Sequence, residues 1–291
     1  MELLRSLVFV PGNRRDMLVK ARDFEADVII ADLEDSVPPE EKLNAREVVA
    51  ENVSTLSGKG QRIMVRLNSL DTGRTRDELA AVIGPHLYGI SVGKFESTWD
   101  IRECDRIMSA AEVSAGLEPG ILKLIPWIEN AKAVMRAYEL ASASPRIVGV
   151  AFGAEDYTDD MGITRTDLGD EVYFPRAMVA MAAKAAGVPA LDGPFVRFRD
   201  EEGLKADTEV ALKLGFKGRF AIHPAQIETI NAMFSPRPGD VEYARRVLEV
   251  WNEAEAQGRG STSLDGKMID VPVVKRARSL LAQAEAMARI R

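Results

Sequence analysis

Two apolar segments of the chain end in carboxylates, and these acids are the first candidates for chemistry. Ile121–Glu129 is an apolar run that closes on Glu129, and Ile147–Asp156 is a β-branched run that closes on Glu155 and Asp156. Such runs are typical of strands buried on both faces. An acid at the exit of a buried strand is costly unless a cation meets it. On one edge of a parallel sheet, Glu129 and Asp156 could hold a hard divalent cation, with water or substrate oxygens completing its shell.

A second interpretation of the same acids stays open at this point. Each acid could instead cap the helix that follows its strand. The two apolar segments and their acids do not by themselves separate a cation site from helix capping.

The composition narrows the class of protein. The chain has 291 residues, 46% hydrophobic and 29% charged, which fits one large barrel or two ordinary domains of a soluble globular protein. The net charge of −7 and the lack of a long basic run argue against nucleic-acid binding. No apolar run reaches membrane length and no signal segment opens the chain, so we expect a cytoplasmic protein without a membrane partner. The single cysteine, Cys104, lies in a helical pattern and is interpreted as a packing residue.

Apolar strand patterns alternate with helical patterns along most of the chain. The predicted strands are Arg5–Gly12, Asp27–Asp35, Arg62–Asn68, Gly89–Lys94, Ile121–Glu129, Ile147–Asp156, Gly187–Pro194 and Arg219–His223. The predicted helices are Asn13–Glu25 with Asn13 as cap, Pro38–Leu56, Thr75–Ile83, Thr98–Ala115, Ala131–Ala141, Phe174–Ala186, Glu201–Leu214 and Pro224–Phe234. Eight strand-then-helix units favour a (β/α)₈ TIM barrel in the α/β class. A doubly wound sheet is the alternative, and no Gly-x-Gly-x-x-Gly follows the first strand to support it.

Polar residues collect at the carboxyl ends of these strands, where the active site of a barrel lies. They are Asp32, Glu34, Asp35, Arg66, Asn68, Lys94, Glu129, Glu155, Asp156, Asp192 and His223. We expect residues 1–236 to form the barrel and residues 237–291 a C-terminal extension. That extension reads as a helix, a Gly-rich turn, an extended segment and a final helix at Val273–Ile290, and it could be a lid, an oligomerisation arm or both.

Seven stretches of the chain form a recognisable set of motifs: Arg5–Arg14 with Lys20, Asp32–Ser36 with Lys42 and Arg46, Val65–Asn68, Ile125–Glu129, Phe152–Asp156, Ala221–Gln226 and Gly266–Asp270. Together they resemble the citrate lyase β-subunit-like family, which includes the malyl-CoA and citramalyl-CoA lyases, within the HpcH/HpaI aldolase superfamily. They occur in the family's order and span nearly the whole chain. The resemblance implies a (β/α)₈ barrel, a Mg²⁺ ion with Mn²⁺ as an alternative, and a CoA thioester substrate.

Carried over by motif, the resemblance assigns roles to individual residues. Glu129 and Asp156 become the metal ligands, and Arg66 holds the carboxylate or 2-oxo group of the keto acid. Asp270 becomes a proton-transfer residue on a segment that covers a neighbouring subunit's site. The implied contacts to the acyl-CoA or keto acid are Phe9, Arg14, Lys20, Glu155, Ile222 and His223, and Asp32, Glu34 and Asp35 are expected to orient metal-bound waters.

The less specific interpretations of these residues are ordinary ones. Without the resemblance, Arg14 and Lys20 would be interpreted as part of a solvated helix face. Arg66 would be interpreted as one member of an ion pair at a strand end, and Asp270 as an exposed turn residue. His223 could act as a base, although a structural or substrate-contacting role is favoured. Trp127 occupies a position that is often smaller in relatives and is expected to reshape the floor of the pocket.

The function implied is Mg²⁺-dependent cleavage of a short 3-hydroxyacyl-CoA, such as malyl-CoA or citramalyl-CoA, into acetyl-CoA and a 2-oxo acid, or the reverse condensation. No Schiff base is needed, so Lys94 has no covalent role. Two alternatives remain: the β subunit of a citrate lyase complex, and a metal-dependent aldolase acting on free 2-keto acids. The intact Gly266–Pro272 segment is expected to favour a free-standing enzyme, and a homo-oligomer, a trimer or dimer of trimers, is predicted.

Overall fold

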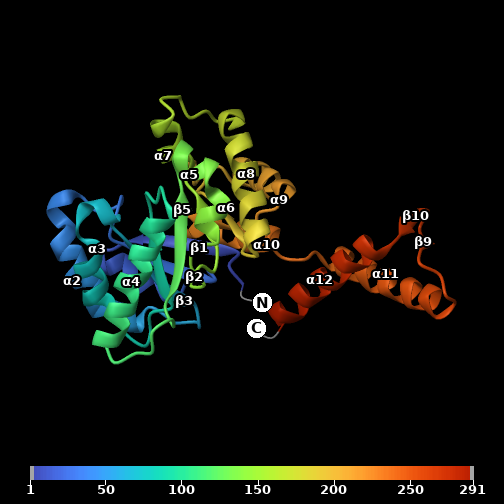
Figure 1. Ribbon diagram of the computed structural model, residues 1–291, viewed down its shortest axis with the longest axis horizontal. Coiled ribbons are helices and arrows are strands. Elements are labelled where there is room, and N and C mark those ends of the chain that lie inside the picture. Colours follow the sequence, from blue (N-terminus) through green and yellow to red (C-terminus); the bar gives the residue numbers. More distant parts are fainter. Residues whose placement is uncertain (1–2, 289–291) are drawn as a thin grey trace. The chain divides into compact units, whose positions relative to one another are not determined.

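Eight parallel strands close into a barrel in the computed structural model, which describes residues 3–288 (Figure 1). Each strand pairs with its neighbours in chain order, and β8 pairs with β1 to complete the ring. The strands are β1 (Ser6–Pro11), β2 (Val28–Asp32), β3 (Arg62–Leu67), β4 (Gly89–Val92), β5 (Lys123–Ile128), β6 (Val150–Phe152), β7 (Ala190–Asp192) and β8 (Gly218–Ala221). The predicted TIM barrel is confirmed, and the doubly wound alternative is not adopted.

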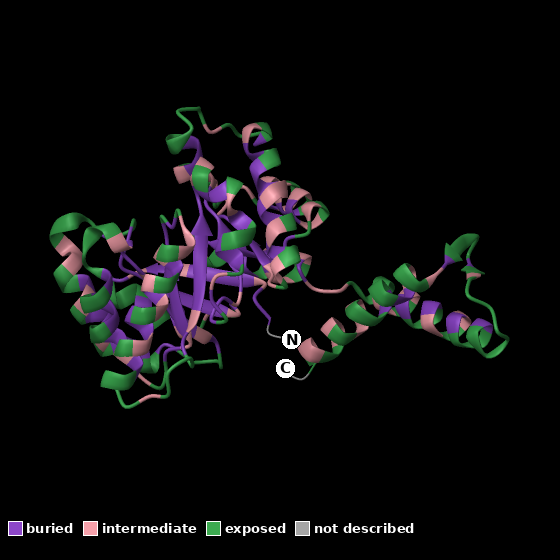
Figure 2. Cartoon of the chain, viewed as in Figure 1, coloured by how far each residue is buried: buried purple, intermediate pink, exposed green. Residues whose placement is uncertain are grey.

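Helices follow the strands and surround the barrel (Figure 1). They are α1 (Arg15–Ala21), α2 (Lys42–Asn52), α3 (Thr75–Val82), α4 (Thr98–Ser114), α5 (Ala131–Met135), α6 (Ala137–Ala141), α7 (Ala154–Asp160), α8 (Asp170–Ala186), α9 (Glu201–Leu214) and α10 (Ile227–Met233). Short 3₁₀ turns η1 (Pro39–Glu41), η2 (Val53–Thr55), η3 (Leu70–Thr72) and η4 (Pro224–Gln226) complete the connections. The strands are buried and the helices expose one face, as Figure 2 shows.

The barrel interior is filled by side chains that recur every second residue along the strands. Val28 and Ile30 of β2, Met64 of β3, and Ile125 and Trp127 of β5 belong to one buried cluster, with other members from β1, β6, β7 and β8. Because side chains alternate between the two faces of a strand, the next inward positions are Asp32, Arg66 and Glu129. The period that fills the core with apolar groups therefore ends in charged groups at the carboxyl ends of β2, β3 and β5.

Three local predictions are wrong. Asn13 does not cap α1: the helix begins at Arg15 after an Arg14 that forms no side-chain cap, and Asn13 Oδ1 is buried without a hydrogen-bond partner in the described structure. The single helix predicted at 131–141 is two helices, because Arg136 leaves the helical conformation at φ −115° and ψ 15°. Glu155 and Asp156 lie in the first turn of α7 and not in a strand, since β6 already ends at Phe152.

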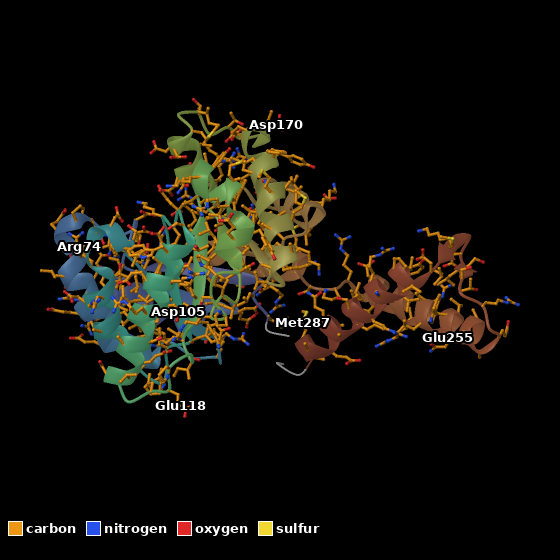
Figure 3. All side chains as sticks on the ribbon, in the orientation of Figure 1. Arg74, Asp105, Glu118, Asp170, Glu255 and Met287 are labelled. Atoms are coloured by element: carbon orange, nitrogen blue, oxygen red, sulfur yellow. The ribbon has the colours of Figure 1, made fainter. Side chains whose placement is uncertain are left out.

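Ion pairs between the barrel and its helices hold the outer layer in place. Asp105 of α4, labelled in Figure 3, accepts a hydrogen bond from Arg146 Nε at 2.5 Å. The carboxylate of Glu112, on the same helix, accepts hydrogen bonds from both terminal nitrogens of Arg146. Cys104 is fully buried on the same helix, and burial raises the pKa of its thiol to about 12. These contacts support its interpretation as a packing residue, because a thiol with so high a pKa is a poor nucleophile at neutral pH.

The chain divides into two compact units, and the barrel unit comprises residues 4–232. The second unit, from Met233 onward, contains α11 (Pro238–Ala256), β9 (Thr262–Leu264), β10 (Lys267–Ile269) and α12 (Val271–Ala288). The segment predicted as simply extended is an antiparallel hairpin. Asp265 and Gly266 form its two-residue turn with φ of 50° and 74°, the conformation that Asp-Gly favours between strands. Trp251, Leu264 and Ile269 are buried in this unit's own core.

No helix among residues 3–288 is long and apolar enough to span a membrane.

Candidate active site

Glu129 follows β5 and is enclosed by backbone from two neighbouring strands. A Cβ atom on Gly93 would collide with Glu129 Oε1, and a Cβ on Gly153 would lie 2.7 Å from Oε2. The Lys94 amide donates a hydrogen bond to Oε1 at 2.7 Å. The Glu129 residue is only 7% exposed. Only glycine at both neighbouring positions leaves room for this carboxylate, which is therefore held in one place.

Helix capping does not explain Glu129. The cap of α5 is Asn130, whose side chain accepts a hydrogen bond from the Ala133 amide at 2.8 Å. On the neighbouring α7, Gly153 precedes the first turn and no side chain caps it. Asp156 lies in that first turn. The positive end of the α7 dipole favours a carboxylate at this position.

Glu129 and Asp156 both line a cavity of about 500 Å³ at the carboxyl ends of β3 to β6. Its other lining residues are Leu70, Asp71, Lys94, Phe95, Glu96, Asp100, Asn130, Asp159 and Asp160. The structure thus brings together the two acids that the strand pattern singled out. The acidic rim formed by Asp71, Glu96, Asp100, Asp159 and Asp160 was not anticipated from the sequence, because these residues lie in helices and loops after the strands and carry no pattern of their own.

The two carboxylates are electrostatically unsatisfied in this arrangement. Burial raises the pKa of Glu129 to about 8, and the charges of Asp156 and Glu34 act in the same direction. Burial also raises the pKa of Asp156, with Asp35 adding to the effect. Acids that repel one another in a buried site favour either a proton or a cation between them. A divalent cation with an oxygen shell fits this donor set.

The donor set leaves room for non-protein ligands. Among residues 3–288, no group of three or more His, Cys, Asp or Glu side chains is arranged to hold a metal ion. Two carboxylates are typical of Mg²⁺ sites, in which water and substrate oxygens occupy the remaining positions. The site therefore fits a cation that is shared with a substrate.

Arg66 lies beside this pair, and its guanidinium is held by the Phe9 ring on one face and by Asp32 along one edge. Its guanidinium stands 4.3 Å above the Phe9 ring and donates two hydrogen bonds to Asp32, each 2.7 Å long. The remaining nitrogen, Nη1, lies 2.9 Å from Asp35 and 3.2 Å from Glu34. Burial alone would raise the pKa of Asp32, but the charge and hydrogen bonds of Arg66 hold it below its usual value. Asp32 is thus a permanent partner, whereas the Asp35 side chain is 57% exposed and can be displaced.

The loop after β2 is held by main-chain and side-chain contacts. The Lys42 ammonium donates to the carbonyl oxygens of Leu33 and Glu34, at 2.8 Å each. Burial raises the pKa of Glu34 to about 7, with the Arg66 charge opposing the shift. Asp32, Glu34 and Asp35 therefore contact Arg66 directly in the described structure, while their predicted role toward metal-bound water stays a prediction.

The aromatic floor beneath Arg66 consists of three rings. Phe9 stacks on Phe220 at 5.2 Å and on Trp127 at 5.9 Å between ring centroids. The Trp127 indole N–H donates to Ser91 Oγ at 2.8 Å. Phe9 and Trp127 thus close the barrel interior below the charged groups, which agrees with a floor position for Trp127.

The other predicted substrate contacts are spread over the surface. Arg14 is exposed and pairs with Asp16 at 3.1 Å, and Lys20 is exposed on α1. The Glu155 side chain is 59% exposed, lies 3.5 Å from Arg165 and does not line the cavity.

Asp192, which the strand-end pattern also singled out, faces out of the barrel, where Arg176 and Arg219 bind it at 2.6 and 2.7 Å. The strand-end pattern found Asp192 without indicating its face, and its neighbour Leu191 takes the inward position.

His223 and Ile222 follow β8. His223 Nδ1 accepts a hydrogen bond from the Ala225 amide at 3.1 Å, and its ring stacks on Phe198 at 4.7 Å. Ile222 is 42% exposed and its amide donates to Gln226 Oε1 at 2.9 Å. These contacts give His223 a structural role in the described residues. Asp270, in the second unit, accepts a hydrogen bond from the Val273 amide at 3.2 Å at the start of α12.

A pH-dependent stability follows from the buried pair. The metal-free folded protein keeps a proton on Glu129 up to about pH 8, whereas the unfolded chain releases it near the model value of 4.5. Stability should therefore fall as pH rises through this window. Relative to the wild type, the free energy of unfolding of Glu129→Gln should rise by more than about 1 kcal/mol between pH 5.5 and 8.5, measured by urea unfolding in EDTA. Because the pKa of Glu34 is also raised, the variant should keep a smaller decrease in stability with pH. The exposed control Glu155→Gln should track the wild type, and equal slopes for all three proteins would contradict the electrostatics described.

The family model and the most similar curated relatives place the chain in one family. The sequence model of the HpcH/HpaI aldolase/citrate lyase family matches residues 5–224. The citrate lyase subunit beta of Leuconostoc mesenteroides is 37% identical over 98% of this chain and 94% of its own. A (3S)-malyl-CoA thioesterase of Cereibacter sphaeroides is 35% identical over 99% of this chain and 96% of its own.

A solved relative carries ligands of the expected kind. The crystal structure of the CitE protein of Mycobacterium tuberculosis in complex with magnesium, acetoacetate and coenzyme A superposes with a TM-score of 0.77. It is 29% identical in sequence and covers 96% of this chain and 97% of its own. The family model and these relatives agree with the closed barrel and its strand-end carboxylates. The chain therefore belongs to the HpcH/HpaI aldolase/citrate lyase family and is a lyase.

Proposed function

We propose that this lyase cleaves a short 3-hydroxyacyl-CoA thioester, such as malyl-CoA or citramalyl-CoA, into acetyl-CoA and a 2-oxo acid. The observation that carries the proposal is the buried pair Glu129 and Asp156 in one cavity, next to an arginine fixed by Asp32. The relative solved with magnesium, acetoacetate and coenzyme A supports both the cation and the thioester. The name of the malyl-CoA thioesterase relative supports the substrate class.

Glu129 and Asp156 would hold a Mg²⁺ ion, with Mn²⁺ as an alternative. When bound, the ion supplies Lewis-acid polarisation of the oxygen that becomes the 2-oxo carbonyl. Its charge would also offset the burial, and the repulsion from neighbouring acids, that raise the pKa of Glu129 and Asp156. The glycine backbones at Gly93 and Gly153 keep the Glu129 carboxylate from turning away.

Arg66 would bind the carboxylate of the keto-acid half. Asp32 engages Nε and Nη2, so the fork keeps one orientation, and Nη1 is the nitrogen able to exchange the exposed Asp35 for a substrate oxygen. A guanidinium can hold Asp32 through two nitrogens and offer the third to the substrate, which an ammonium on a flexible stem cannot do. Phe9 supports the guanidinium from below through its ring face.

The reaction requires loss of the hydroxyl proton, C–C cleavage and protonation of the thioester enolate at carbon. Lys94 is unsuited to a covalent step. Burial would lower its pKa, but the charges of Glu34 and Asp156 outweigh burial and raise it. Lys94 therefore stays an ammonium, which is a poor nucleophile. The proton donor to the enolate would be Asp270, the role that the family resemblance implies.

The runner-up function is the β subunit of a citrate lyase complex. Relatives named citrate lyase subunit beta are as similar as the thioesterase relatives and align over nearly the full chain. The presence of the Gly266–Pro272 segment therefore does not separate a free-standing enzyme from a complex subunit. The specificity for malyl-CoA or citramalyl-CoA, an aldolase activity on free 2-keto acids, and a cytoplasmic location all stay predictions.

A homo-oligomer, a trimer or dimer of trimers, is part of the proposal. Helix α8 leaves Tyr173, Phe174 and Met181 exposed at 54%, 70% and 63%. Apolar side chains gathered on one helix are typical of surfaces that bind another chain. In such an assembly residues 237–291 would act as the lid and oligomerisation arm, with Asp270 serving a neighbour's site.

The metal assignment is tested by Asp156→Asn. Loss of one negative ligand should abolish Mg²⁺ binding in calorimetry and reduce release of acetyl-CoA from malyl-CoA at least about a hundredfold, on the order of 2.7 kcal/mol. Asp159→Asn is the matched control, because Asp159 lines the same cavity but is exposed. Unchanged Mg²⁺ affinity in Asp156→Asn would remove this residue from the metal site, and lack of cleavage of every thioester by the wild type would sink the proposed function.

Arg66→Lys keeps the charge but loses the fork. We expect kcat/KM for the keto acid in the condensation direction to fall more than about tenfold, on the order of 1.4 kcal/mol. Arg62→Lys, on the same strand β3 but at its opposite end, should change it little. A loss below about threefold for Arg66→Lys would count against carboxylate binding by a guanidinium that Asp32 holds in one orientation.

Mixing two inactive variants tests whether Asp270 acts on a neighbour. Asp270→Asn keeps the acceptor for the Val273 amide, so α12 should remain capped while proton transfer is lost. Each of Asp270→Asn and Asp156→Ala alone should be inactive, and their hybrid oligomers should regain part of the activity. Hybrids verified by mass that stay inactive would show that Asp270 does not act in trans.

A further inference from the structure

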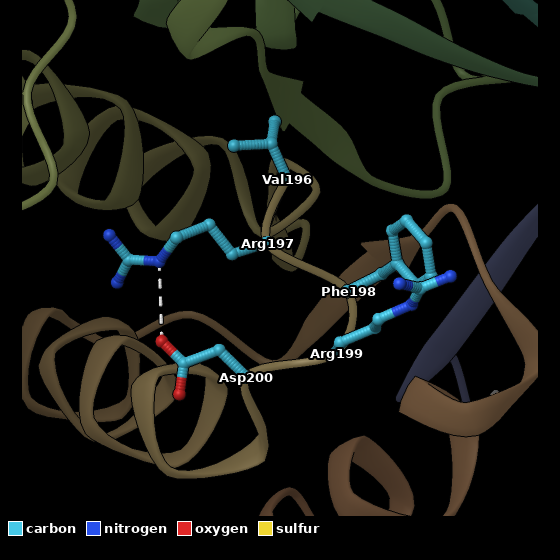
Figure 4. Close-up of a pocket in the computed structure, with 5 residues that line it drawn as sticks. All are labelled: Val196, Arg197, Phe198, Arg199 and Asp200. Atoms are coloured by element: carbon cyan, nitrogen blue, oxygen red, sulfur yellow. Dashed lines mark hydrogen bonds and ion pairs between the residues drawn. The ribbon is translucent and has the colours of Figure 1, made fainter.

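Carboxylates near helix starts organise several of the loops that follow barrel strands. After β7, Asp200 accepts hydrogen bonds from Arg197 Nε at 3.2 Å and from the Gly203 amide at 2.8 Å, and it lines a cavity of about 480 Å³ on that loop (Figure 4). After β3, Glu78 lies in the first turn of α3 and is only 3% exposed. Glu78 is thus a buried acid that takes no part in the chemistry described above.

Glu78 binds both the backbone and the side chain of Asn68, the residue that follows β3. Its Oε2 accepts a hydrogen bond from the Asn68 backbone amide at 2.9 Å, and its Oε1 accepts one from Asn68 Nδ2 at 2.5 Å. Asn68 Nδ2 also donates to the Leu33 carbonyl oxygen at 2.8 Å. A carboxylate offers two acceptor oxygens and no donor, so it can accept both N–H groups at once. Glu78 therefore fixes the backbone and the side-chain orientation of Asn68 together.

These contacts alter the hydrogen bonding between β2 and β3 directly after the Asp32–Arg66 pair. In a parallel ladder, a residue donates its N–H and accepts with its C=O on either side of the residue opposite. Leu33 keeps the first of these bonds, because its N–H donates to the Arg66 carbonyl oxygen at 2.9 Å. For the second, the Asn68 backbone N–H is bound to Glu78, and the longer Asn68 side chain reaches the Leu33 carbonyl oxygen instead. Glu78 therefore diverts the ladder just beyond the pair that orients Arg66.

The Leu33 carbonyl oxygen links this arrangement to the loop around Arg66. The oxygen also accepts a hydrogen bond from Lys42 Nζ at 2.8 Å, and the same ammonium donates to the Glu34 carbonyl oxygen. The Glu34 carboxylate in turn lies 3.2 Å from Arg66 Nη1. A continuous series of contacts therefore runs from Glu78 through Leu33 to the loop that surrounds the nitrogen proposed to meet the substrate.

Stability alone does not account for a carboxylate at this position. Burial raises the pKa of Glu78, and the hydrogen bonds from Asn68 oppose that shift only in part. A buried charge contributes little net stability when its removal from water is costly. A fully hydrogen-bonded polar network does, however, hold its members in one geometry. The geometry of the strand ends is therefore what the Glu78 carboxylate supplies.

We infer that Glu78 is a positioning residue for recognition of the keto acid, because it sets the spacing of β2 and β3 that aims Arg66 Nη1 at the substrate carboxylate. Glu78 acts through Asn68 and Leu33 and does not itself contact the substrate. This inference rests on the proposed function for its substrate, whereas the geometry of Arg66 can be measured without any turnover.

The test compares Glu78→Gln with Glu112→Gln in the condensation direction. Glu78→Gln keeps the side-chain volume but leaves one Asn68 N–H facing an amide donor, so KM for glyoxylate or pyruvate, whichever the wild type condenses, should rise at least about fivefold. KM for acetyl-CoA should change less than about twofold. Glu112 is equally buried but binds Arg146 and the Leu122 amide before β5, at the end of the barrel opposite to Arg66. Glu112→Gln should therefore lower the urea midpoint of unfolding and leave both KM values unchanged. A keto-acid KM in Glu78→Gln within about twofold of the wild type overturns the inference.

Two further variants separate positioning from a general loss of stability. In an Arg66→Lys background, Glu78→Gln should raise the keto-acid KM by less than about twofold more, because the guanidinium that Glu78 positions is already absent. Full additivity of the two losses would contradict the inference. Asn68→Ala breaks the link between Glu78 and Leu33 and should reproduce the KM change of Glu78→Gln, so it decides the question if Glu78→Gln does not fold.

Crystal structures of the wild type and Glu78→Gln test the same inference without turnover. The Leu33–Glu34 segment should move relative to Arg66 Nη1 by at least about 1 Å, a displacement large enough to impair a preorganised site. Strand ends that superpose more closely than this would overturn the inference. If the wild type condenses no keto acid with acetyl-CoA, the proposed function is wrong, and the crystal structures still decide whether Glu78 positions Arg66.

Discussion

The burial of the Glu129 carboxylate beside a second acid is the constraint on which the site depends. Its oxygens have glycine backbone on two sides and the Lys94 amide as donor, and Asp156 lines the same cavity. Such an arrangement is unfavourable for two free carboxylates, because burial and repulsion both oppose ionisation. It becomes favourable when a cation occupies the space between them. The fold thus holds two buried acids whose ionisation is unfavourable until a cation binds, and Glu129 keeps a proton near neutral pH without one.

The same barrel interior imposes the second arrangement, that of Arg66. Its position continues the inward period of β3 above Met64, directly over Phe9. A buried guanidinium needs a paired carboxylate, and Asp32 occupies the equivalent inward position of the adjacent strand β2. The register that pairs Asp32 with Arg66 therefore fixes both the charge pair and the direction of Nη1. Substrate recognition by Arg66 follows from strand register as much as from residue type.

The charged residues at the strand ends could be predicted from the sequence better than the structure around them. Glu129, Asp156 and Arg66 could be found because apolar runs ended in charges at the edge where parallel strands meet. Asp192 met the same criterion, but residue order alone does not say which face of a three-residue strand is inward. The enclosure of Glu129 by Gly93 and Gly153 depends on contacts across three strands, which no local pattern encodes. The helix break at Arg136 and the Asn13 Oδ1 atom that has no hydrogen-bond partner likewise reflect tertiary packing that overrides local propensity.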